Sequence, residues 1–204
     1  EEMKMAQNRL NTVTPISSLR NMLDIARSEA GDTIAYKYKE NKEVISVTYS
    51  QFYEDVYALG CGLSDLGIEK THIACVGENS YRWINAYLSV LCSDSVFVGI
   101  DKELPPDDFF RILDISDTTV LFYWRKSEQL LKENLARLSS IKYFIGIDRA
   151  EDDGNFLSFD LLREKGRKIY KEGKSPYLDM KSPVEDLKML IYTSGTTGLS
   201  KGVM

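Results

Sequence analysis

The stretch LKMLIYTSGTTGLSKGVM, residues 187–204, decides the fold of this chain. Its first six residues, Leu187 to Tyr192, form a short and almost unbroken apolar run. Such a run is typical of a strand that is buried on both faces of a sheet. The ten residues that follow, 193–202, contain five hydroxyl side chains, three glycines and Lys201. The sequence therefore predicts a buried strand that leads directly into a small, polar, glycine-rich loop.

The composition of this loop is suited to binding phosphate. Glycine allows backbone conformations with positive φ and lets backbone N–H groups come close to a ligand. Successive N–H groups in such a turn form a concavity that binds anions. The hydroxyl groups donate further hydrogen bonds, and Lys201 supplies a positive charge that attracts phosphate oxygens. We therefore expect a phosphate-binding loop at residues 193–202.

The spacing disfavours two common phosphate-binding motifs. A Walker-type loop requires Gly, four residues and then Gly-Lys-Ser/Thr, whereas Lys201 follows Ser200 and precedes Gly202. The dinucleotide fingerprint Gly-x-Gly-x-x-Gly needs a third glycine, and none fits the spacing of Gly195 and Gly198. A kinase or NTPase is disfavoured for the same reason. A flexible Ser/Thr/Gly linker is the plainer alternative, but linkers rarely follow an apolar strand directly or end in Lys-Gly-Val.

The order YTSGTTGLSKG at 192–202 resembles the signature loop of the adenylate-forming (AMP-binding) superfamily, which includes acyl-CoA synthetases, luciferases and adenylation domains of peptide synthetases. It departs from the usual pattern at Ser200, where relatives most often have proline. The resemblance implies that Thr193 helps to hold Mg²⁺ and that the following residues grip the β- and γ-phosphates of ATP. The implied phosphate-binding residues are Thr193, Ser194, Gly195, Thr196, Thr197, Gly198 and Lys201.

A second stretch, GENSYRWINAYL at 77–88, resembles the long-chain acyl-CoA synthetase branch when taken with DKELP at 101–105. Gly99 departs from that pattern, because relatives usually have proline there. The aromatic residues Tyr81, Trp83 and Tyr87 are most simply explained as packing of a helix on a sheet, since aromatic side chains mostly serve as core.

The resemblance implies a two-step ligase. ATP and a carboxylic acid, most simply a fatty acid, give an acyl-adenylate and pyrophosphate, and the thiol of coenzyme A then takes the acyl group. In the first step, negative charge develops at phosphorus and on the departing pyrophosphate. It would be stabilised by fixed N–H donors, hydroxyls, Lys201 and Mg²⁺. No catalytic residue is assigned within this chain. An adenylation domain for an amino or aryl acid and a non-catalytic nucleotide-binding module are the alternatives. The sequence leaves open which acid is activated, whether CoA or a carrier-protein thiol accepts it, and the oligomeric state.

The overall composition limits which binding partners and which cellular compartment are expected. The 204 residues are 43% hydrophobic and 28% charged, with a net charge of -5. No basic block occurs, which argues against nucleic acid as the main partner. Three widely spaced cysteines without a Cys-x-x-Cys pair favour reduced, buried thiols in a cytoplasmic protein. His72, the single histidine, is interpreted as a structural residue. The sequence also lacks a run long enough for a transmembrane helix and, at its N-terminus, the pattern of a secretory leader.

Apolar periodicity predicts an α/β fold with a parallel sheet and helices on both faces. An N-terminal helix and a β-hairpin precede that sheet. We expect the first helix from Ser17 or Ser18 to Gly31, hairpin strands at 33–39 and 44–49, and a helix from a Ser50 cap to Gly67. We expect sheet strands at 72–76, 95–100, 119–124 and 141–147, with helices at 80–91, from Pro105, and from a Ser127 cap through Leu138. We expect a further helix at 158–172 and a loop at 173–183.

The resemblance also implies a domain organisation. Residues 1–16 are expected to be an N-terminal extension, and residues 17–204 the N-terminal part of an AMP-binding domain that ends in the loop at 193–202. Relatives continue well beyond this loop, so both ends of the chain look cut. We expect the remainder of the domain, and a small C-terminal domain with a catalytic lysine, to lie outside it. The fragment alone is accordingly expected to be inactive and to associate with itself or another chain, because its last strand needs a cover.

Overall fold

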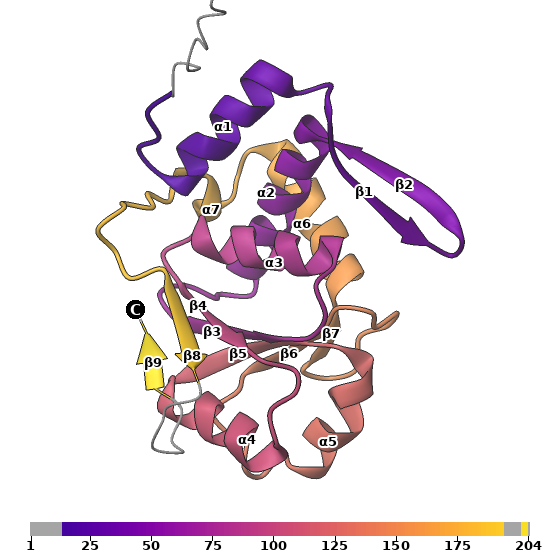
Figure 1. The fold of residues 1–204 in the computed structure, drawn as a ribbon, viewed down its shortest axis with the longest axis vertical. Helices are drawn as coiled ribbons and strands as arrows, with labels where there is room; N and C mark the ends of the chain where they lie inside the picture. The colour runs from indigo at the N-terminus through magenta and orange to yellow at the C-terminus, as the bar shows by residue number, and fades with distance from the viewer. Residues whose placement is uncertain (1–13, 194–200, 204) are drawn as a thin grey trace, which may run out of the picture.

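The computed structural model describes residues 14–193 and 201–203 and contains a central sheet with helices on both faces (Figure 1). The strand order is β7-β6-β5-β3-β4-β8-β9. All neighbouring strands are parallel except β8 and β9, which are antiparallel. The bounds are β3 His72–Val76, β4 Val96–Ile100, β5 Thr118–Tyr123, β6 Tyr143–Gly146, β7 Phe156–Ser158, β8 Met189–Thr193 and β9 Lys201–Val203. The predicted α/β class with a parallel sheet is confirmed.

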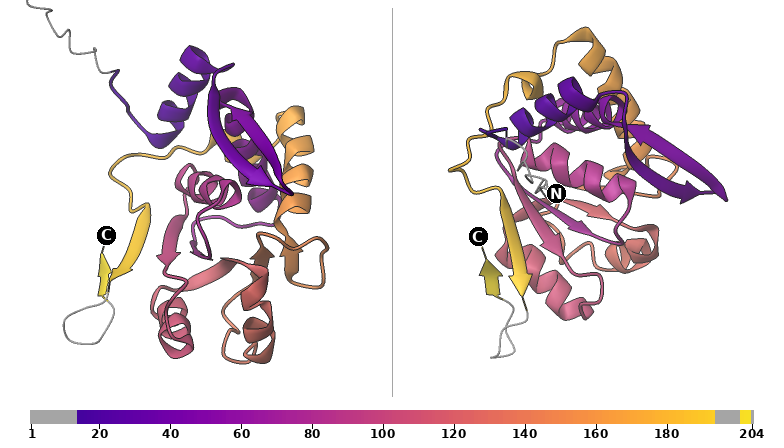
Figure 2. Two further views of the ribbon diagram at one scale, coloured as in Figure 1. Left: turned by 45° about the vertical axis from the view of Figure 1, so that its right-hand side comes forward. Right: turned by 45° about the horizontal axis from the view of Figure 1, so that its top comes forward.

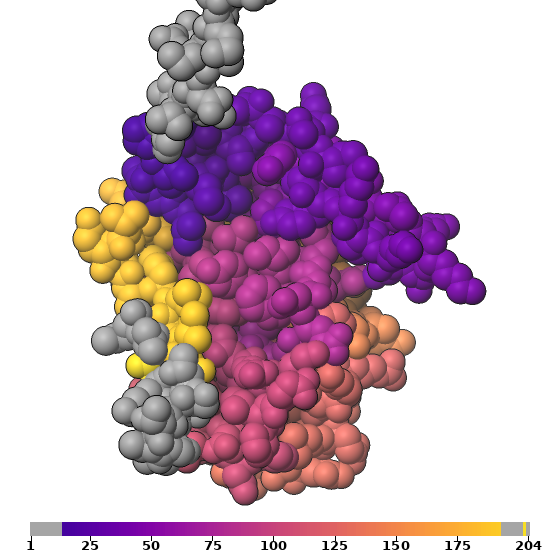
Figure 3. Space-filling model, in the orientation of Figure 1, coloured from indigo at the N-terminus to yellow at the C-terminus, as the bar shows by residue number. Residues whose placement is uncertain are grey.

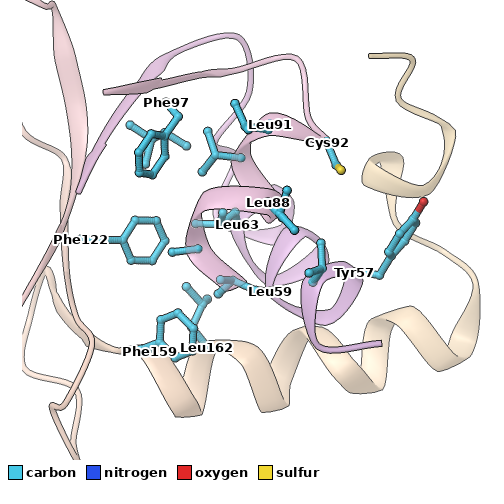
Figure 4. Close-up of a cluster of buried hydrophobic side chains, with 14 of the residues drawn as sticks. Tyr57, Leu59, Leu63, Leu88, Leu91, Cys92, Phe97, Phe122, Phe159 and Leu162 are labelled. Carbon is cyan, nitrogen blue, oxygen red and sulfur yellow. The ribbon is translucent and has the colours of Figure 1, made fainter. Parts of the chain in front are cut away.

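The sheet separates two hydrophobic cores because successive side chains of a strand point to opposite faces. In β3, Ile73 and Cys75 join one core, whereas Ala74 and Val76 join the other. The larger core also contains Leu59, Phe97 and Phe122 (Figure 4). The helices on its face are α2 Tyr49–Asp65, α3 Tyr81–Leu91 and α6 Phe159–Glu172, and those on the opposite face are α4 Pro106–Ile115 and α5 Glu128–Glu133 (Figure 2). This two-sided covering is what the alternation of strands and helices predicted.

The N-terminal part lies over the helical layer that contains α2 (Figure 1). Helix α1 is Leu19–Ala30, and its cap is Ser18, whose side chain accepts a hydrogen bond from the backbone N–H of Asn21. The hairpin strands are β1 Ile34–Glu40 and β2 Glu43–Thr48, and they project from the body of the molecule (Figure 3). Arg82 of α3 links this hairpin to the helical layer, because it forms ion pairs with Glu40 of β1 at 2.8 Å and with Asp160 of α6 at 3.0 Å.

Two predicted helix caps are wrong. The cap of α2 is Thr48 rather than Ser50, and it forms a reciprocal capping box with Gln51, which satisfies two backbone N–H groups at once. Ser127 makes no side-chain cap hydrogen bond. The helix after it ends at Glu133, well short of Leu138, and continues as turns. Its final turn closes around Asn134, whose side-chain amide donates to the carbonyl of Leu130.

Strand β7 and helix α7 were not predicted. Strand β7 has only three residues, so it offers too short a pattern for apolar alternation. Helix α7, Pro176–Asp179, lies within the expected loop at 173–183. It starts at a proline and is capped by Ser175, and both features are typical of a helix N-terminus.

The prediction that the run 187–192 is buried on both faces is also wrong. Leu190 is buried, with an exposed fraction of 8%, and faces the core that contains α4. Ile191 is 44% exposed and Leu187 is 40% exposed, so the other face of β8 is open at this end. The physical reason is that α3 covers β4 and reaches only Met189 of β8.

No helix in the described part of the chain is long and apolar enough to cross a membrane.

Candidate functional site

The carboxyl ends of the central strands form the most informative edge of the sheet. Strand β3 leads into α3 on one face of the sheet, whereas its neighbours β4 and β5 lead into α4 and α5 on the other face. Where connections leave neighbouring parallel strands in opposite directions, a crevice opens at the carboxyl ends, and ligands of open α/β sheets bind there. The candidate site is therefore expected between the turns that follow β3, β4 and β8.

Strand β8 carries the predicted phosphate loop to this same edge. It pairs with β9 as an antiparallel hairpin, in which Tyr192 lies opposite Gly202 and Thr193 lies opposite Lys201. The backbone thus brings the two ends of the predicted loop together. The predicted residues between them, Ser194, Gly195, Thr196, Thr197 and Gly198, lie outside the described residues. The side chains of Thr193 and Lys201 lie outside the description as well, so the predicted phosphate and Mg²⁺ contacts stay predictions.

A pocket of about 660 Å³ lies beside this hairpin. Residues of β4 and β8 form its floor, namely Phe97, Gly99, Met189 and Ile191. Trp83 and Tyr87 of α3 form one wall. The remaining lining residues are Gly77, Glu78, Asn79, Ile100, Asp101, Lys102 and Tyr192. The pocket is therefore apolar at its floor and polar at its rim, which is the usual construction of a small-molecule site.

Three aromatic rings give the pocket a rigid corner. Trp83 and Tyr87 are stacked, with ring centroids 5.4 Å apart and planes at 13°. Both rings meet Phe97 edge-on, at 5.7 Å and 5.0 Å respectively. The Tyr87 hydroxyl donates to the sulfur of Met189 at 3.8 Å, which links α3 to β8. Trp83 and Tyr87 thus pack on the sheet as expected, and they also line the pocket, which the sequence interpretation did not favour.

Gly99 leaves the floor of the pocket open. It lies in β4 between Cys75 of β3 and Ile191 of β8. A Cβ atom added to Gly99 would meet only the ring of Phe97, at an ordinary van der Waals distance of 3.7 Å. The space above Gly99 is therefore free for a larger group. This residue is also one of the positions at which the sequence departs from the long-chain acyl-CoA synthetase pattern.

The rim of the pocket carries a small charged cluster. Glu78, in the turn after β3, lies 3.4 Å from Lys102 after β4 and 3.3 Å from Lys126 after β5. Hydrogen bonds from Lys126 and Lys102 lower the pKa of Glu78. The hydrogen bond with Glu78 in turn raises the pKa of Lys102. All three side chains are exposed, so this cluster sets the local charge of the rim rather than contributing much stability.

Close packing closes the crevice between β3 and β5. Gly77 approaches Trp124 so closely that an added Cβ would lie 1.5 Å from the indole ring. The indole nitrogen Nε1 of Trp124 is buried and has no hydrogen-bond partner among the described residues. Any residue larger than glycine at this turn would displace the ring, so the open part of the crevice lies on the β4–β8 side.

The other candidate residues lie away from this edge or are buried. His72 begins β3 at the opposite end of the sheet, and its Nδ1 is hydrogen-bonded to the carbonyl of Ser116, in agreement with a structural role. Cys61, Cys75 and Cys92 are buried and form no disulfide, and burial raises the pKa of Cys92 to about 12. Within residues 14–193 and 201–203, no group of three or more His, Cys, Asp or Glu could hold a metal ion.

The sequence did not identify Phe97, Gly99, Met189 and Ile191 as pocket residues. Each belongs to a strand, and strands 4 and 8 are adjacent only because the chain returns to β4 after β7. The usable signal was the rule that ligands bind at the carboxyl ends of parallel strands. That rule predicts at which edge of the sheet a ligand binds, but the order of the strands must be known before the pocket residues can be identified.

Curated relatives match large parts of the chain. Tyrocidine synthase 3 of Brevibacillus parabrevis is 31% identical over 160 residues, which cover 78% of this chain and 2% of that protein. The long-chain-fatty-acid–CoA ligase of Thermus thermophilus is 26% identical over 163 residues, which cover 79% of this chain and 28% of the ligase. The chain thus spans well under a third of the length of either protein.

Solved structures share the fold. The anthranilate CoA ligase AuaEII, in complex with anthranoyl-AMP, superposes with a TM-score of 0.77 and 21% identity, covering 93% of this chain and 35% of that ligase. A family model described as AMP-binding enzyme matches residues 23–204. The match includes all of the sheet, the pocket and the loop that follows β8. This chain therefore belongs to the AMP-binding enzyme family.

Proposed function

We propose that this chain supplies the ATP phosphate-binding part of an enzyme that activates a carboxylic acid, most simply a fatty acid, and transfers it to coenzyme A. Membership of the AMP-binding family supports the adenylation step. The similarity to a long-chain-fatty-acid–CoA ligase supports a fatty acid and CoA as substrates. The three free, buried cysteines support a reducing, cytoplasmic setting.

The observation that carries this proposal is the geometry of the β8–β9 hairpin. Its pairing of Thr193 with Lys201 holds both ends of a loop rich in hydroxyls and glycine at the carboxyl edge of the sheet. An apolar pocket opens beside the same strand, at Met189 and Ile191. Phosphate donors and an apolar cavity side by side suit a reaction between a nucleoside triphosphate and an apolar acid.

The chemistry requires charge to be stabilised around phosphorus. The carboxylate oxygen of the acid attacks the α-phosphorus of ATP, the bond to the β-phosphate oxygen breaks, and pyrophosphate leaves. Hydroxyls and backbone N–H groups of the loop would donate hydrogen bonds to the phosphate oxygens, and Lys201 would hold their negative charge. The hydroxyl of Thr193 would offer Mg²⁺ an oxygen ligand, which is the kind of ligand that this ion prefers. Mg²⁺, when bound, would neutralise phosphate charge.

Two alternatives are supported by other observations. Adenylation of an amino acid with a carrier-protein thiol as acceptor is one alternative, because the superfamily that the loop resembles includes adenylation domains of peptide synthetases; the chain is also similar to tyrocidine synthase 3. Likeness to an anthranilate CoA ligase suits an aryl acid in the aromatic pocket. A non-catalytic nucleotide-binding module is the remaining alternative. These differ in the acid that supports adenylate formation, so one assay separates them.

The test is ATP–pyrophosphate exchange in the complete protein, with fatty, aryl and amino acids as substrates. We expect exchange with fatty acids and a loss of about 100-fold in Lys201→Ala at limiting ATP, because one charged phosphate contact is removed. Lys201→Arg should retain part of the rate. Lys165→Ala, which removes an exposed lysine of α6, is the matched control and should leave the rate unchanged. An unchanged rate in Lys201→Ala would exclude the proposed role, and exchange with no acid would favour the non-catalytic module.

A further inference from the structure

We propose that a pocket at the amino-terminal edge of the sheet is a second ligand site, and that it binds a small organic phosphate. The pocket has a volume of about 660 Å³ and lies where β3, β5 and β6 begin. Residues 66–71, which connect α2 to β3, form one side of it. Thr119 and Val120 of β5, with Lys142 and Tyr143 at the start of β6, form the other side. The proposal does not rest on the proposed function, because none of these residues takes part in it.

The pocket is separate from the edge of the sheet at which the predicted phosphate loop begins. Strand β3 joins the two edges, with Thr71 before it and Gly77 after it. Because a strand rises about 3.3 Å per residue, Thr71 and Gly77 lie roughly 20 Å apart along the strand. A small molecule in this pocket therefore does not touch the residues at the carboxyl edge, and it binds in addition to any ligand there.

The inner wall of the pocket is apolar. Ile68 and Val120 are buried in the larger hydrophobic core, and the half-buried side chains of Leu66 and Tyr143 pack against that core. Beside them, Gly67 has no side chain, and a Cβ atom added to it would meet nothing within 4 Å. An apolar group in this space would remove the remaining exposed surface of Leu66 and Tyr143 from water. The volume also lies within the range of sites that hold small organic molecules.

The rim of the pocket is positively charged. Lys70 and Lys142 both line it and are exposed. Within residues 14–193 and 201–203 neither ammonium group forms an ion pair, whereas Lys165 pairs with Asp65 at 2.6 Å. Glu69 also lines the pocket, so one positive charge remains in excess, in a chain whose net charge is -5. The local field therefore favours an anion.

Two threonine hydroxyls add a hydrogen-bond donor. The Oγ1 atoms of Thr71 and Thr119 are 2.6 Å apart, so one hydroxyl donates to the other. Because each hydroxyl has one proton, the accepting hydroxyl keeps its own proton for a further acceptor. The backbone holds these groups in place, since the N–H of Lys142 donates to the carbonyl of Thr119 at 2.7 Å. The N–H of Lys70 likewise donates to Oδ1 of Asp94 at 3.1 Å.

This donor set suits a phosphate group better than a carboxylate. Two ammonium groups and a hydroxyl proton can serve the three outer oxygens of a phosphate ester, and lysine binds phosphate as a point charge. A carboxylate has two oxygens and pairs best with the planar fork of arginine. Arginine is not among the described residues that line the pocket. The ligand class is therefore a phosphate ester whose organic part is apolar and small enough for the inner wall.

The binding test uses calorimetric titration of the 204-residue chain with phenyl phosphate, inorganic phosphate and phenol. Phenyl phosphate carries both the ring and the charge, and each of the other two probes carries only one of them. We expect phenyl phosphate to bind about tenfold or more tightly than either, because each probe lacks one set of contacts. An affinity for phenyl phosphate no higher than that for phenol or for inorganic phosphate would overturn the proposal.

Variants locate the site. Lys70→Ala/Lys142→Ala should weaken phenyl phosphate binding by about tenfold or more, since charge-assisted hydrogen bonds are lost. The matched control is Lys37→Ala/Lys39→Ala, which removes the same charge from two exposed lysines of the β1–β2 hairpin and should leave the affinity unchanged. An equal loss in both double variants would show attraction by overall charge and would overturn the site.

Two single variants complete the test. Thr119→Val keeps the shape of the side chain and removes its hydroxyl, so it should weaken binding severalfold even if the lysine variant does not fold. Lys201→Ala should leave the affinity unchanged, because Lys201 belongs to the opposite edge of the sheet. Loss of phenyl phosphate binding in Lys201→Ala would place the probe at the loop after β8 and overturn the proposal. So would equal affinity of the parent, Thr119→Val and Lys70→Ala/Lys142→Ala.

Discussion

Gly166 of α6 lies so close to the backbone of α2 that an added Cβ would be 1.9 Å from the carbonyl oxygen of Ala58. It would also lie 2.5 Å from the backbone nitrogen of Gly62. The two helices therefore touch backbone to backbone, and this contact fixes α6 over the larger hydrophobic core. Leu162, one turn earlier in α6, is buried in that core beside Leu59 and Phe159 (Figure 4).

Gly166→Ala is therefore expected to destabilise the fold. Alanine's better helix propensity favours the variant by about 1 kcal/mol, but forcing a methyl group against backbone atoms costs about 1–3 kcal/mol or more. Because the clash is with backbone atoms, the cost lies at the upper end of that range, and we expect a net loss of about 2 kcal/mol in the free energy of unfolding, measured by urea denaturation. Gly99→Ala is the control, because its Cβ meets only an ordinary contact, and it should change stability by less than about 0.5 kcal/mol. Equal stability of both variants would contradict the packing argument.

Asp55 of α2 is the centre of a polar cluster that joins three elements. Its carboxylate accepts hydrogen bonds from Arg167 of α6 at 2.5 Å and from the Tyr81 hydroxyl of α3 at 2.6 Å, and Arg163 lies 3.5 Å away. The carboxylate is largely buried, with a side-chain exposed fraction of 14%. Removing it leaves the Tyr81 hydroxyl without its acceptor and takes one carboxylate partner from each guanidinium group, although Arg163 keeps Asp160 and Arg167 keeps Glu164.

We therefore expect Asp55→Ala to reduce the free energy of unfolding by about 3 kcal/mol. Asp107→Ala removes one partner of an exposed ion pair with Arg137, and it should cost less than about 0.5 kcal/mol. Both values follow from urea denaturation of the two variants side by side. A loss for Asp55→Ala as small as that for Asp107→Ala would show that the cluster contributes little to stability.

Glu128 makes stability depend on pH in the acid range. Burial by itself would raise the pKa of Glu128, but hydrogen bonds from Arg149, Lys132 and Tyr123 outweigh burial and lower it to about 2. The contacts are short, at 2.6 Å to Arg149, 2.9 Å to Lys132 and 2.9 Å to Tyr123. Because the pKa is lower in the folded state than in the unfolded state, the stabilisation is fully present above about pH 4.5. It is lost as the pH falls from about 4.5 towards 2.

We expect Glu128→Gln to be less stable than the parent by about 3 kcal/mol at pH 7, since each unit of pKa shift corresponds to about 1.4 kcal/mol. That difference should shrink steadily when both proteins are unfolded at lower pH. The exposed residue Glu103 is the control, and Glu103→Gln should follow the parent at every pH. A difference between Glu128→Gln and the parent that stays constant down to pH 3 would rule out the assigned pKa.

Much of the fold follows from local signals in the sequence. Ser18 caps the first helix, as one of the two predicted candidates. Ser80 and Ser158, at which two further helices were expected to begin, are the caps of those helices, because each side chain accepts a hydrogen bond from a backbone N–H that otherwise lacks a partner. The strands from His72 to Gly146 were recognisable because both of their faces are buried, which gives continuous apolar runs. These signals lie within a few residues of one another and need no knowledge of the tertiary structure.

Errors arose where two local signals compete or where tertiary contacts decide. Thr48 and Ser50 are both suitable N-cap residues. Thr48 is the cap because the Gln51 side chain accepts a hydrogen bond from the backbone N–H of Thr48, while the Thr48 side chain accepts one from the backbone N–H of Gln51. The apolar run at Ile191 predicts burial, but no described element covers that side chain. The pocket could not be predicted at residue level, because it depends on β8 lying beside β4, more than ninety residues earlier in the chain. Gly99 could be singled out by its departure from the family pattern, but its place in the lining of the pocket could not be predicted.

The open face of β8 leads to the last prediction, which concerns self-association. Val184, Leu187 and Ile191 are 66%, 40% and 44% exposed, and they lie within eight residues of one another at the end of the sheet that includes β9, an edge strand among those described. Exposed apolar groups and an edge strand both favour association. The net charge of -5 opposes it weakly, because salt at 0.15 M screens charges over about 8 Å.

We therefore expect the 204-residue chain to form dimers or larger species at micromolar concentration, measured by light scattering. The double variant Val184→Ser/Leu187→Ser should shift these species towards monomer, since it removes exposed apolar surface without touching the core. Leu135→Ser is the control, because Leu135 is 43% exposed but lies after α5, on the opposite face of the sheet from α3, and it should leave association unchanged. A monomer across the whole concentration range would show that the exposed residues on and before β8 do not suffice for pairing. Equal association of the double variant and the parent would instead place the contact elsewhere on the surface.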